Sequence, residues 1–398
     1  MGDELIRQPS FGVNQSGVRV YNERLLLTML QRRGAMPGSD LARVAGLSPQ
    51  TVSVILRKLE KDGILERGAP TKGKVGKPSV PMRLAANGVL AYGLKLGRRA
   101  ADLVVMNFHG QVHRQLTTRY QYPMPEQIHD FLADGLARLA NDLSARDRSR
   151  LCGLGIAAPF ELWNWTEKMD VPDAYYGAWR DTDIRALVGS VTDLPVSLIN
   201  DATAACQAEH VFGNGKNFRD YAYFYVGAII GGGIVLNDSV FEGNQNNAGA
   251  FGPMRMGTYD GQEKQLIDTA SLYLLENELE AAGHDKQMIW DFPQDWSGIA
   301  DVADKWIART AEELARASLT TCSVIDMEAI VIDGTFPDNV RQTLVVATRA
   351  AMMRLDRRGL VTPRIEAGNV GVNARAIGAA YHPISTRFLL NTNAGFVN

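Results

Sequence analysis

The residues best suited to contact a partner lie between positions 48 and 57. Polar side chains that donate and accept hydrogen bonds, and one guanidinium, recur there at helical spacing: Gln50, Thr51, Ser53 and Arg57. The opposite face of the same stretch is apolar: Val52, Ile55, Leu56 and Leu59. Side chains of this kind can bind base edges in a DNA major groove. Taken alone, the stretch also fits an ordinary helical hairpin with a solvated polar face.

The elements that must position these side chains form a helix-turn-helix. Residues 40–45 fit a short helix, with Ser39 as its N-cap. Gly46 fits the left-handed backbone that often ends a helix. Ser48 is expected to cap the following helix, and Pro49 fits its first position, where its missing N–H costs nothing.

The flanking segments extend this motif to a winged helix. Residues 19–31 have the apolar spacing of a third helix, and two strand-like segments, 64–67 and 80–84, enclose a basic stretch. We therefore predict a winged helix-turn-helix over 16–84 that binds double-stranded DNA, after a flexible arm at 1–15. The predicted DNA contacts, from the second helix and the wing, are Ser48, Gln50, Thr51, Ser53, Arg57, Lys72, Lys74 and Lys77.

Charge divides the chain in the same way. Residues 1–83 hold 14 Lys and Arg against 7 Asp and Glu, a net charge of +7. The remainder holds 28 Lys and Arg against 37 Asp and Glu, a net charge of −9. A small basic module on a larger acidic body is typical of a phosphate-binding head joined to a part that does not bind DNA.

Length and composition indicate the class of protein. At 398 residues, 45% of them hydrophobic, the chain is expected to form more than one globular domain. No apolar run reaches the roughly 18 residues of a membrane span, and the charged N-terminus is no secretory signal. We therefore predict a cytoplasmic protein with no membrane partner. The three cysteines are far apart and show no metal-binding spacing.

After Gly88 the pattern becomes one of alternating strands and helices. Three strand-like segments, a helix and a fourth strand resemble the start of a ribonuclease-H-like lobe: 89–96, 101–108, 111–120, 125–143 and 151–157. A second set follows, with strands at 196–199, 221–226, 233–236 and 329–332 and helices at 202–212, 268–282, 302–319, 339–355 and from 374. Two such sets predict a two-lobed, actin-like α/β body over 89–398.

Motifs within this body carry a family resemblance. Asn-Asp-Ala-Thr-Ala-Ala at 200–205 is followed by Gly231–Val235 and by Ala248–Gly252, and together these segments resemble the ROK family. That family contains sugar kinases and, with an added winged helix, sugar-responsive repressors. The resemblance implies a repressor of carbohydrate uptake or catabolism genes. It also implies a homodimer or homotetramer on DNA and a sugar-like effector between the lobes.

A carbohydrate kinase with an accessory DNA-binding head is the alternative. The resemblance puts Asp201 at the position of the general base. However, the kinases' Asp-x-Gly-Gly-Thr phosphate loop is Lys95-Leu96-Gly97-Arg98-Arg99 here, and the second loop is Gly227-Ala228-Ile229. Long side chains obstruct a loop that must present backbone N–H groups to phosphate. We therefore expect no enzymatic activity and no cofactor. A third possibility is a DNA-binding protein whose body only dimerises.

The resemblance also implies a sugar site with unusual contacts. Asn200 and Asp201 match the family pattern, but apolar residues replace three polar contacts: Ala250, Pro253 and Ile267. Asn247 and Asn164 could supply other contacts, so the predicted ligand-binding set is Asn200, Asp201, Asn247 and Asn164. Asn200 and Asp201 also fit a strand-to-helix cap. No metal is expected, because Pro253 replaces a histidine and 254–267 lacks cysteine.

Overall fold

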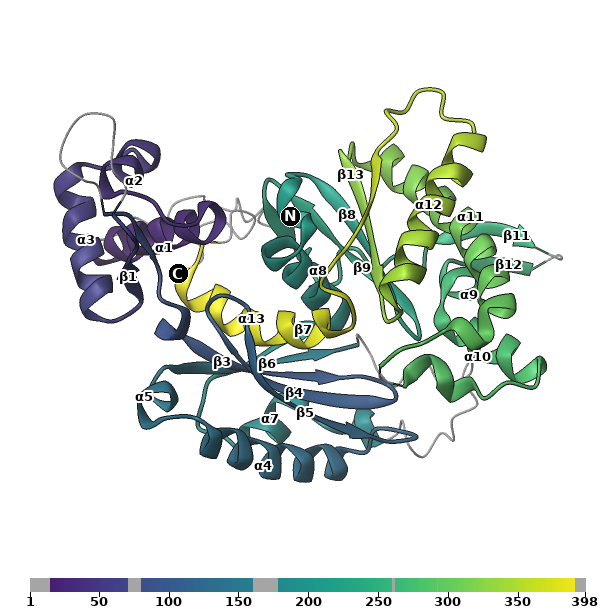
Figure 1. Ribbon diagram of the computed structural model, residues 1–398, viewed down its shortest axis with the longest axis horizontal. Helices are drawn as coiled ribbons and strands as arrows, with labels where there is room; N and C mark the ends of the chain where they lie inside the picture. The colour runs from purple at the N-terminus through teal and green to yellow at the C-terminus, as the bar shows by residue number, and fades with distance from the viewer. Residues whose placement is uncertain (1–14, 71–79, 160–177, 260–261, 292, 391–398) are drawn as a thin grey trace, which may run out of the picture. The chain divides into compact units, whose positions relative to one another are not determined.

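The computed structural model describes residues 15–70, 80–159, 178–259, 262–291 and 293–390. Their contacts divide the chain into two compact units. One unit contains the residues up to Ala85 together with Thr386–Leu390, and the other contains Ala86–Ser385. The elements of both are labelled in Figure 1.

The first unit is a winged helix, as predicted. Its elements are α1 (Gln15–Arg33), α2 (Gly38–Ala45), α3 (Pro49–Lys61), β1 (Leu65–Arg67) and β2 (Met82–Leu84). β1 and β2 pair antiparallel. Side chains from all three helices and both strands are buried together, among them Leu26, Leu41, Ile55, Leu65 and Leu84. The chain returns to this unit near its end, where the backbone N–H of Leu390 donates to Thr28 Oγ1 at 2.9 Å.

Local capping explains the turn between α2 and α3. Gly46 ends α2 with a φ of +67°, and Ser48 caps α3 by accepting from the backbone N–H of Thr51 at 3.1 Å. Both predictions are confirmed. The cap predicted at Ser39 is wrong, because α2 already begins at Gly38. The Pro37 carbonyl accepts the N–H groups of Asp40 and Leu41, which places Ser39 inside the first turn.

The first lobe of the larger unit is built on a five-stranded sheet of order β5-β4-β3-β6-β7. Its strands are β3 (Leu90–Leu96), β4 (Ala100–Asn107), β5 (Val112–Arg119), β6 (Leu151–Ala158) and β7 (Val196–Asn200). β3 and β7 pair parallel with β6, and the other pairs are antiparallel. In Figure 1, α4 (Pro125–Asp142) and α7 (Ile184–Gly189) cover one face of this sheet, and α13 (Ala374–Phe388) covers the other. The short α5 (Ala145–Arg148) precedes β6.

The second lobe is built on a sheet of order β10-β9-β8-β13-β14. Its strands are β8 (Tyr221–Val226), β9 (Ile230–Leu236), β10 (Ser239–Phe241), β13 (Ala329–Gly334) and β14 (Arg364–Ala367). Alternate residues of β8 face opposite cores. Ala222 and Phe224 pack toward α11 (Ala300–Val324) and α12 (Asp338–Arg354), whereas Tyr221 and Tyr223 pack toward α8 (Asp201–Phe212). The two sheets with their helices confirm the predicted actin-like body.

The structure corrects the expected elements at two places. The single helix expected over 268–282 is two helices, α9 (Ile267–Ala270) and α10 (Leu272–Ala281). They are separated because Ser271 is extended and buried, and its hydroxyl accepts from Ile230 N and donates to the Ile267 carbonyl. β9 begins at Ile230 instead of Gly233. Its glycines lie inside the strand because α8 packs closely against it, and a Cβ at Gly231 would lie 2.9 Å from the Cβ of Ala202.

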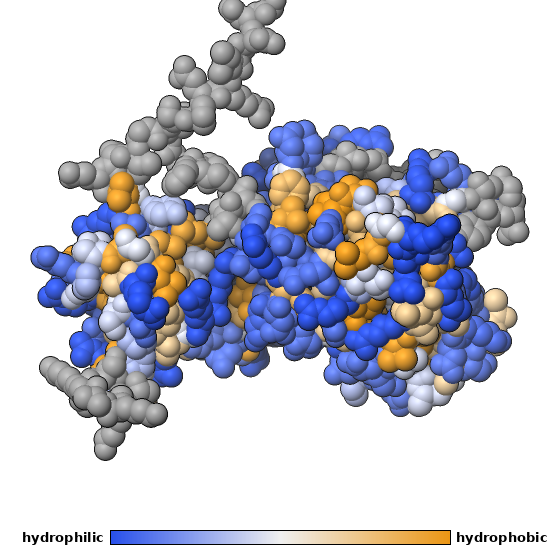
Figure 2. All heavy atoms as spheres, turned by 90° about the horizontal axis from the view of Figure 1, so that it is seen from above, coloured by the Kyte–Doolittle hydropathy of each residue, from blue (hydrophilic) through white to orange (hydrophobic). Residues whose placement is uncertain are grey.

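The remaining elements were not expected from the sequence. They are the hairpin β11 (Arg255–Tyr259) and β12 (Gln262–Gln265), the strands β10 and β14, the short helices α5 and α7, and 3-10 turns at Ala86–Gly88, Asn214–Asn217, Lys286–Trp290, Ser297–Ile299 and Gly371–Asn373. No helix in the described part of the chain is both long and apolar enough to cross a membrane. Hydrophilic side chains cover most of the face drawn in Figure 2, with apolar ones in small groups between them.

Candidate DNA-binding surface and candidate effector site

α3 presents a broad exposed face to solvent. Its core side is formed by Val52, Ile55, Leu56 and Leu59, all under 9% exposed. The predicted contacts Gln50, Thr51, Ser53 and Arg57 are exposed on the remaining surface, and the structure adds Val54 and Lys61 to them. The surface is therefore a mixture of hydrogen-bonding, cationic and apolar groups on one helix.

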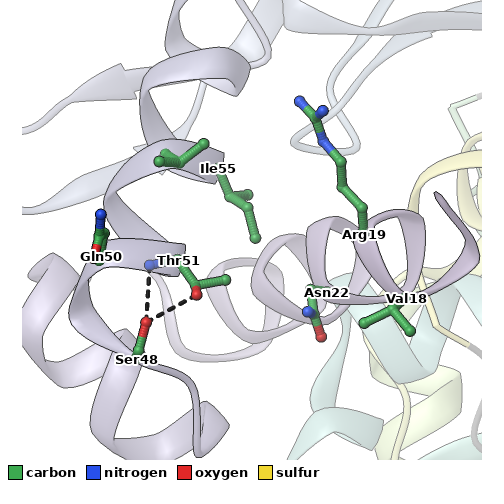
Figure 3. A pocket seen from close by; sticks show the side chains of 8 residues that line it. Val18, Arg19, Asn22, Ser48, Gln50, Thr51 and Ile55 are labelled. Atoms are coloured by element: carbon green, nitrogen blue, oxygen red, sulfur yellow. Dashed lines mark hydrogen bonds between the residues drawn. The ribbon is translucent and has the colours of Figure 1, made fainter. Parts of the chain in front are cut away.

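A shallow pocket of about 430 Å³ lies where the first turns of α3 face α1. Figure 3 shows the side chains that line it, from Val18, Arg19 and Asn22 on α1 and from Ser48, Gln50, Thr51, Val54 and Ile55 on or before α3. The Ser48 hydroxyl lies 2.8 Å from the Thr51 hydroxyl in addition to capping the helix. The capped start of α3 thus lies beside a hollow lined by both polar and apolar side chains.

Ion pairs connect α3 with the neighbouring elements of the winged helix. Lys58 Nζ lies 2.7 Å from the Glu23 carboxylate and joins α3 to α1. The wing strands carry Arg67 paired with Glu60 at 2.7 Å and Arg83 paired with Glu66 at 2.8 Å. Surface pairs of this kind contribute little to stability, but they link α3 to α1 and to β1, and β1 to β2. The predicted wing contacts Lys72, Lys74 and Lys77 lie outside the described residues.

In the body, Asn200 is used as a helix cap. Its Oδ1 accepts the backbone N–H groups of Ala202 at 3.0 Å and Thr203 at 3.1 Å, which caps α8. The cap interpretation of Asn200 is therefore correct. Its predicted ligand contact stays a prediction, and any such contact must come from the amide nitrogen, because the cap occupies the oxygen.

Asp201 is held by a cation. Arg375 Nη1, at the start of α13, donates to Asp201 Oδ2 at 3.2 Å. The guanidinium also lies 5.0 Å from the centre of the Tyr225 ring and 3.5 Å from Thr335 Oγ1. Burial by itself lowers the pKa of Arg375, but Tyr225 and Asp201 more than offset this and raise it above its usual value. The carboxylate at the position of the kinases' general base is thus paired with a permanent cation.

A second ion pair occupies the stretch that matches the kinase phosphate loop. Lys95 Nζ lies 2.9 Å from Asp102 Oδ2, and Asp102 also accepts from Thr117 and Gln115. Burial lowers the pKa of Lys95, and the nearby charge of Arg375 lowers it further. Burial alone would raise the pKa of Asp102, but Lys95 and Thr117 hold it below its usual value.

The same turn also contacts the second lobe. Arg99 Nη2 lies 3.5 Å from the Glu276 carboxylate on α10, and Trp290 Nε1 donates to that carboxylate at 2.6 Å. Glu276 is only 5% exposed, so the carboxylate end of this pair is shielded from water. The β3–β4 turn therefore bridges the lobes through the Arg99–Glu276 ion pair.

Asn247 lies in a tight loop that packs against β9. Gly243, Asn246 and Gly249 all have positive φ, and a Cβ at Gly249 would lie 2.5 Å from Gly233. This loop and the start of α8 thus pack on the same strand, and Asn247 is half-buried in the loop. Its predicted ligand contact stays a prediction. Asn164 lies outside the described residues.

The three apolar residues at positions where the family has polar sugar contacts differ in their burial. Ala250 and Pro253 are exposed, whereas Ile267 is 1% exposed and belongs to the core of the second lobe. Burial explains why an apolar side chain suits position 267.

Sequence reasoning missed two further polar groups near α8. Gln207 Nε2 lies 3.4 Å from Glu242 Oε1, and burial raises the pKa of Glu242. Neither this pair nor Arg375 had a sequence signal, because their partners are distant in the chain. Among the described residues, no group of three or more His, Cys, Asp or Glu side chains could hold a metal ion.

These features define a class of protein in which a winged helix is joined to a two-lobed, actin-like α/β body. The model of the ROK family matches residues 91–383, and the chain belongs to that family. The model of the MarR family matches residues 21–72, which identifies the first unit as a MarR-type winged helix.

Individual relatives agree with this assignment. An uncharacterized protein of Sinorhizobium fredii is 22% identical over 92% of this chain and 91% of its own length. The xylose repressor of Bacillus subtilis is also 22% identical, over 61% of this chain and 62% of that repressor.

Solved structures show the same fold. A ROK family transcriptional regulator, a homolog of the E. coli MLC protein, superposes with a TM-score of 0.67 at 17% identity and covers 93% of this chain and 96% of that one. A ROK glucokinase from Streptomyces griseus superposes with a TM-score of 0.58 at 20% identity, over 73% of this chain and 98% of that one. The kinase therefore matches the body, and the regulator matches nearly the whole chain.

Proposed function

We propose that this chain is a DNA-binding transcriptional repressor of genes for carbohydrate uptake or catabolism. The observation that carries the proposal is the exposed face of α3, held by the Ser48 cap and a buried apolar side in a MarR-type winged helix. A helix presented in this way can enter a major groove, where Gln50 and Arg57 suit adenine and guanine edges. The wing lysines 72, 74 and 77 would contact phosphates.

A small sugar-like effector would control DNA binding through the body. Membership of the ROK family and the match to xylose repressors support this part of the proposal. The candidate contacts are the Asn200 amide nitrogen, Asp201, Asn247 and Asn164. Because Ala250, Pro253 and Ile267 contribute no hydrogen bonds from their side chains, we expect the effector to rely on a different set of polar contacts from those of the family's sugar kinases.

The remaining parts of the proposal follow from this role. The winged helix would extend over 16–84 and the effector and dimerisation body over 89–398. A homodimer or homotetramer would place two α3 helices in major grooves about 34–36 Å apart on a near-palindromic operator. DNA as the target would place the protein in the cytoplasm. The body would not act as a kinase, because Arg375 pairs with Asp201 and the Lys95–Asp102 pair occupies the phosphate-loop position.

Selection of bound fragments from the source genome at fixed salt would test the proposal. We expect enrichment of a near-palindromic site, and the genes beside it would name the sugars to test as effectors. An Arg57→Ala variant should lose about 1–3 kcal/mol of preference for that site over random DNA. Arg43→Ala, an exposed arginine on α2, is the matched control and should keep the preference. Equal binding of all duplexes by the wild-type protein would refute the proposal.

A further inference from the structure

One exposed side chain on α3 is apolar. Val54 is 50% exposed and lies among polar and cationic residues of the same helix face. Gln50 is four residues before it, Arg57 three residues after it and Lys61 seven residues after it, so all four share one side of the helix. This side lies opposite the buried stripe centred on Leu59 and Val52. Val54 is therefore near the middle of the surface that would face a partner.

The surroundings of Val54 are partly apolar as well. Val54, Val18 and Ile55 form apolar parts of the pocket beside the start of α3. Arg19, Asn22, Gln50 and Thr51 form its polar parts (Figure 3). A partner that fits this surface must present a small apolar group next to hydrogen-bonding and anionic groups.

DNA presents such a combination at one place. The C5 methyl of thymine is the apolar group on a major-groove base edge, and it lies between hydrogen-bonding base edges and the phosphates. The net charge of +7 over residues 1–83, with Arg57 and Lys61 on the same face as Val54, favours a polyanion over a second copy of an acidic body.

We propose that Val54 is a specificity-determining residue that contacts a thymine methyl in the operator. The inference rests on the proposed function and specifies one base of the operator that α3 would recognise. Gln50, one helical turn earlier, would bind a neighbouring base edge, and the operator would carry thymine opposite Val54 in each half-site. Removing that methyl should weaken binding without disturbing base pairing.

Uracil substitution isolates this contact. The duplex selected by the wild-type protein would be prepared in versions with each thymine in turn replaced by uracil, which lacks only the methyl. We expect one position per half-site where uracil weakens wild-type binding about 4-fold, the effect of about 0.8 kcal/mol for one buried methyl group. At that position Val54→Ala should bind thymine and uracil duplexes equally.

A matched variant and a folding measurement complete the test. Val44→Ala alters a valine on α2 that is 39% exposed and does not line the pocket, so it should discriminate against uracil as the wild type does. Thermal unfolding should show all three proteins equally folded, because Val54 is not part of the core.

Two outcomes would overturn the inference. One is equal wild-type binding of thymine and uracil duplexes at every position. The other is a Val54→Ala variant that still binds the thymine duplex more tightly than the uracil duplex. If the oligomeric state of that variant also changes, Val54 contacts a second copy of the chain instead of DNA. If no preferred duplex can be selected, the proposed function fails together with the inference. A preferred duplex with no uracil effect refutes the inference alone.

Discussion

His382 is a buried imidazole whose surroundings favour its neutral form. It lies on α13, is 9% exposed, and burial lowers its pKa to about 4, with the charge of Arg185 adding to the shift. An unfolded histidine has a pKa near 6.5. Protonation below that value therefore favours the unfolded chain. The stability that His382 contributes is present above pH 6.5 and is lost as the pH falls toward 4.

We expect this residue to lower the free energy of unfolding of the body by about 2 kcal/mol between pH 7 and pH 5. Urea denaturation of the wild type and of His382→Phe at both pH values would measure the effect. In His382→Phe, the free energy of unfolding should change less between pH 7 and pH 5, by about 2 kcal/mol. His113→Gln, which alters an exposed histidine on β5, should behave as the wild type. An unchanged pH dependence in His382→Phe would show that the imidazole is not held neutral.

At the scale of elements, the body depends on helices that pack with almost no side chain between them. A Cβ at Gly378 on α13 would lie 1.8 Å from the backbone oxygen of Ala204 on α8. A Cβ at Gly155 on β6 would lie 1.9 Å from the backbone oxygen of Ala379. α13 therefore lies directly against both α8 and the first sheet, which brings Arg375 close enough to pair with Asp201.

We expect Gly378→Ala to destabilise the body by about 3 kcal/mol, because backbone atoms must move apart to admit the methyl group. The sign of this stability change is informative, because replacing glycine by alanine in a helix interior is otherwise favourable by about 1 kcal/mol. Gly189→Ala at the end of α7 is the control, because an added Cβ there would meet nothing within 4 Å. Comparable unfolding midpoints for the two variants would contradict the close packing.

At the scale of the whole molecule, the ROK fold is combined with a set of ion pairs in the body. The two lobes and their connecting helices are those of the ROK family, and Lys95, Arg99 and Arg375 pair with carboxylates within them. Phosphoryl transfer requires a loop that cradles phosphate and a base able to act on a hydroxyl. In this chain, Lys95 of the stretch that resembles the kinase loop pairs with Asp102, and Arg375 pairs with Asp201.

We therefore expect no ATP consumption above the enzyme-free rate with any sugar in a broad panel. Asp201→Asn, which removes the carboxylate charge, should leave that rate unchanged. The measurement is coupled ADP release by the full-length protein. Sugar-dependent turnover in the wild type that disappears in Asp201→Asn would instead establish the kinase alternative.

By itself, the sequence determines the parts of this protein that depend on neighbours in the chain. Gly46, Ser48 and Pro49 define the turn of the helix-turn-helix because capping acts over a few residues, and apolar periodicity determines most helices and strands of both lobes. Contacts between distant residues were decided only by the tertiary structure. Arg375 meets Asp201 across 174 positions, and Ser271 divides a helix because it bonds to Ile230. Helical spacing places Val54 opposite the buried stripe of α3, but its position in a pocket beside α1 was decided only by how the two helices pack.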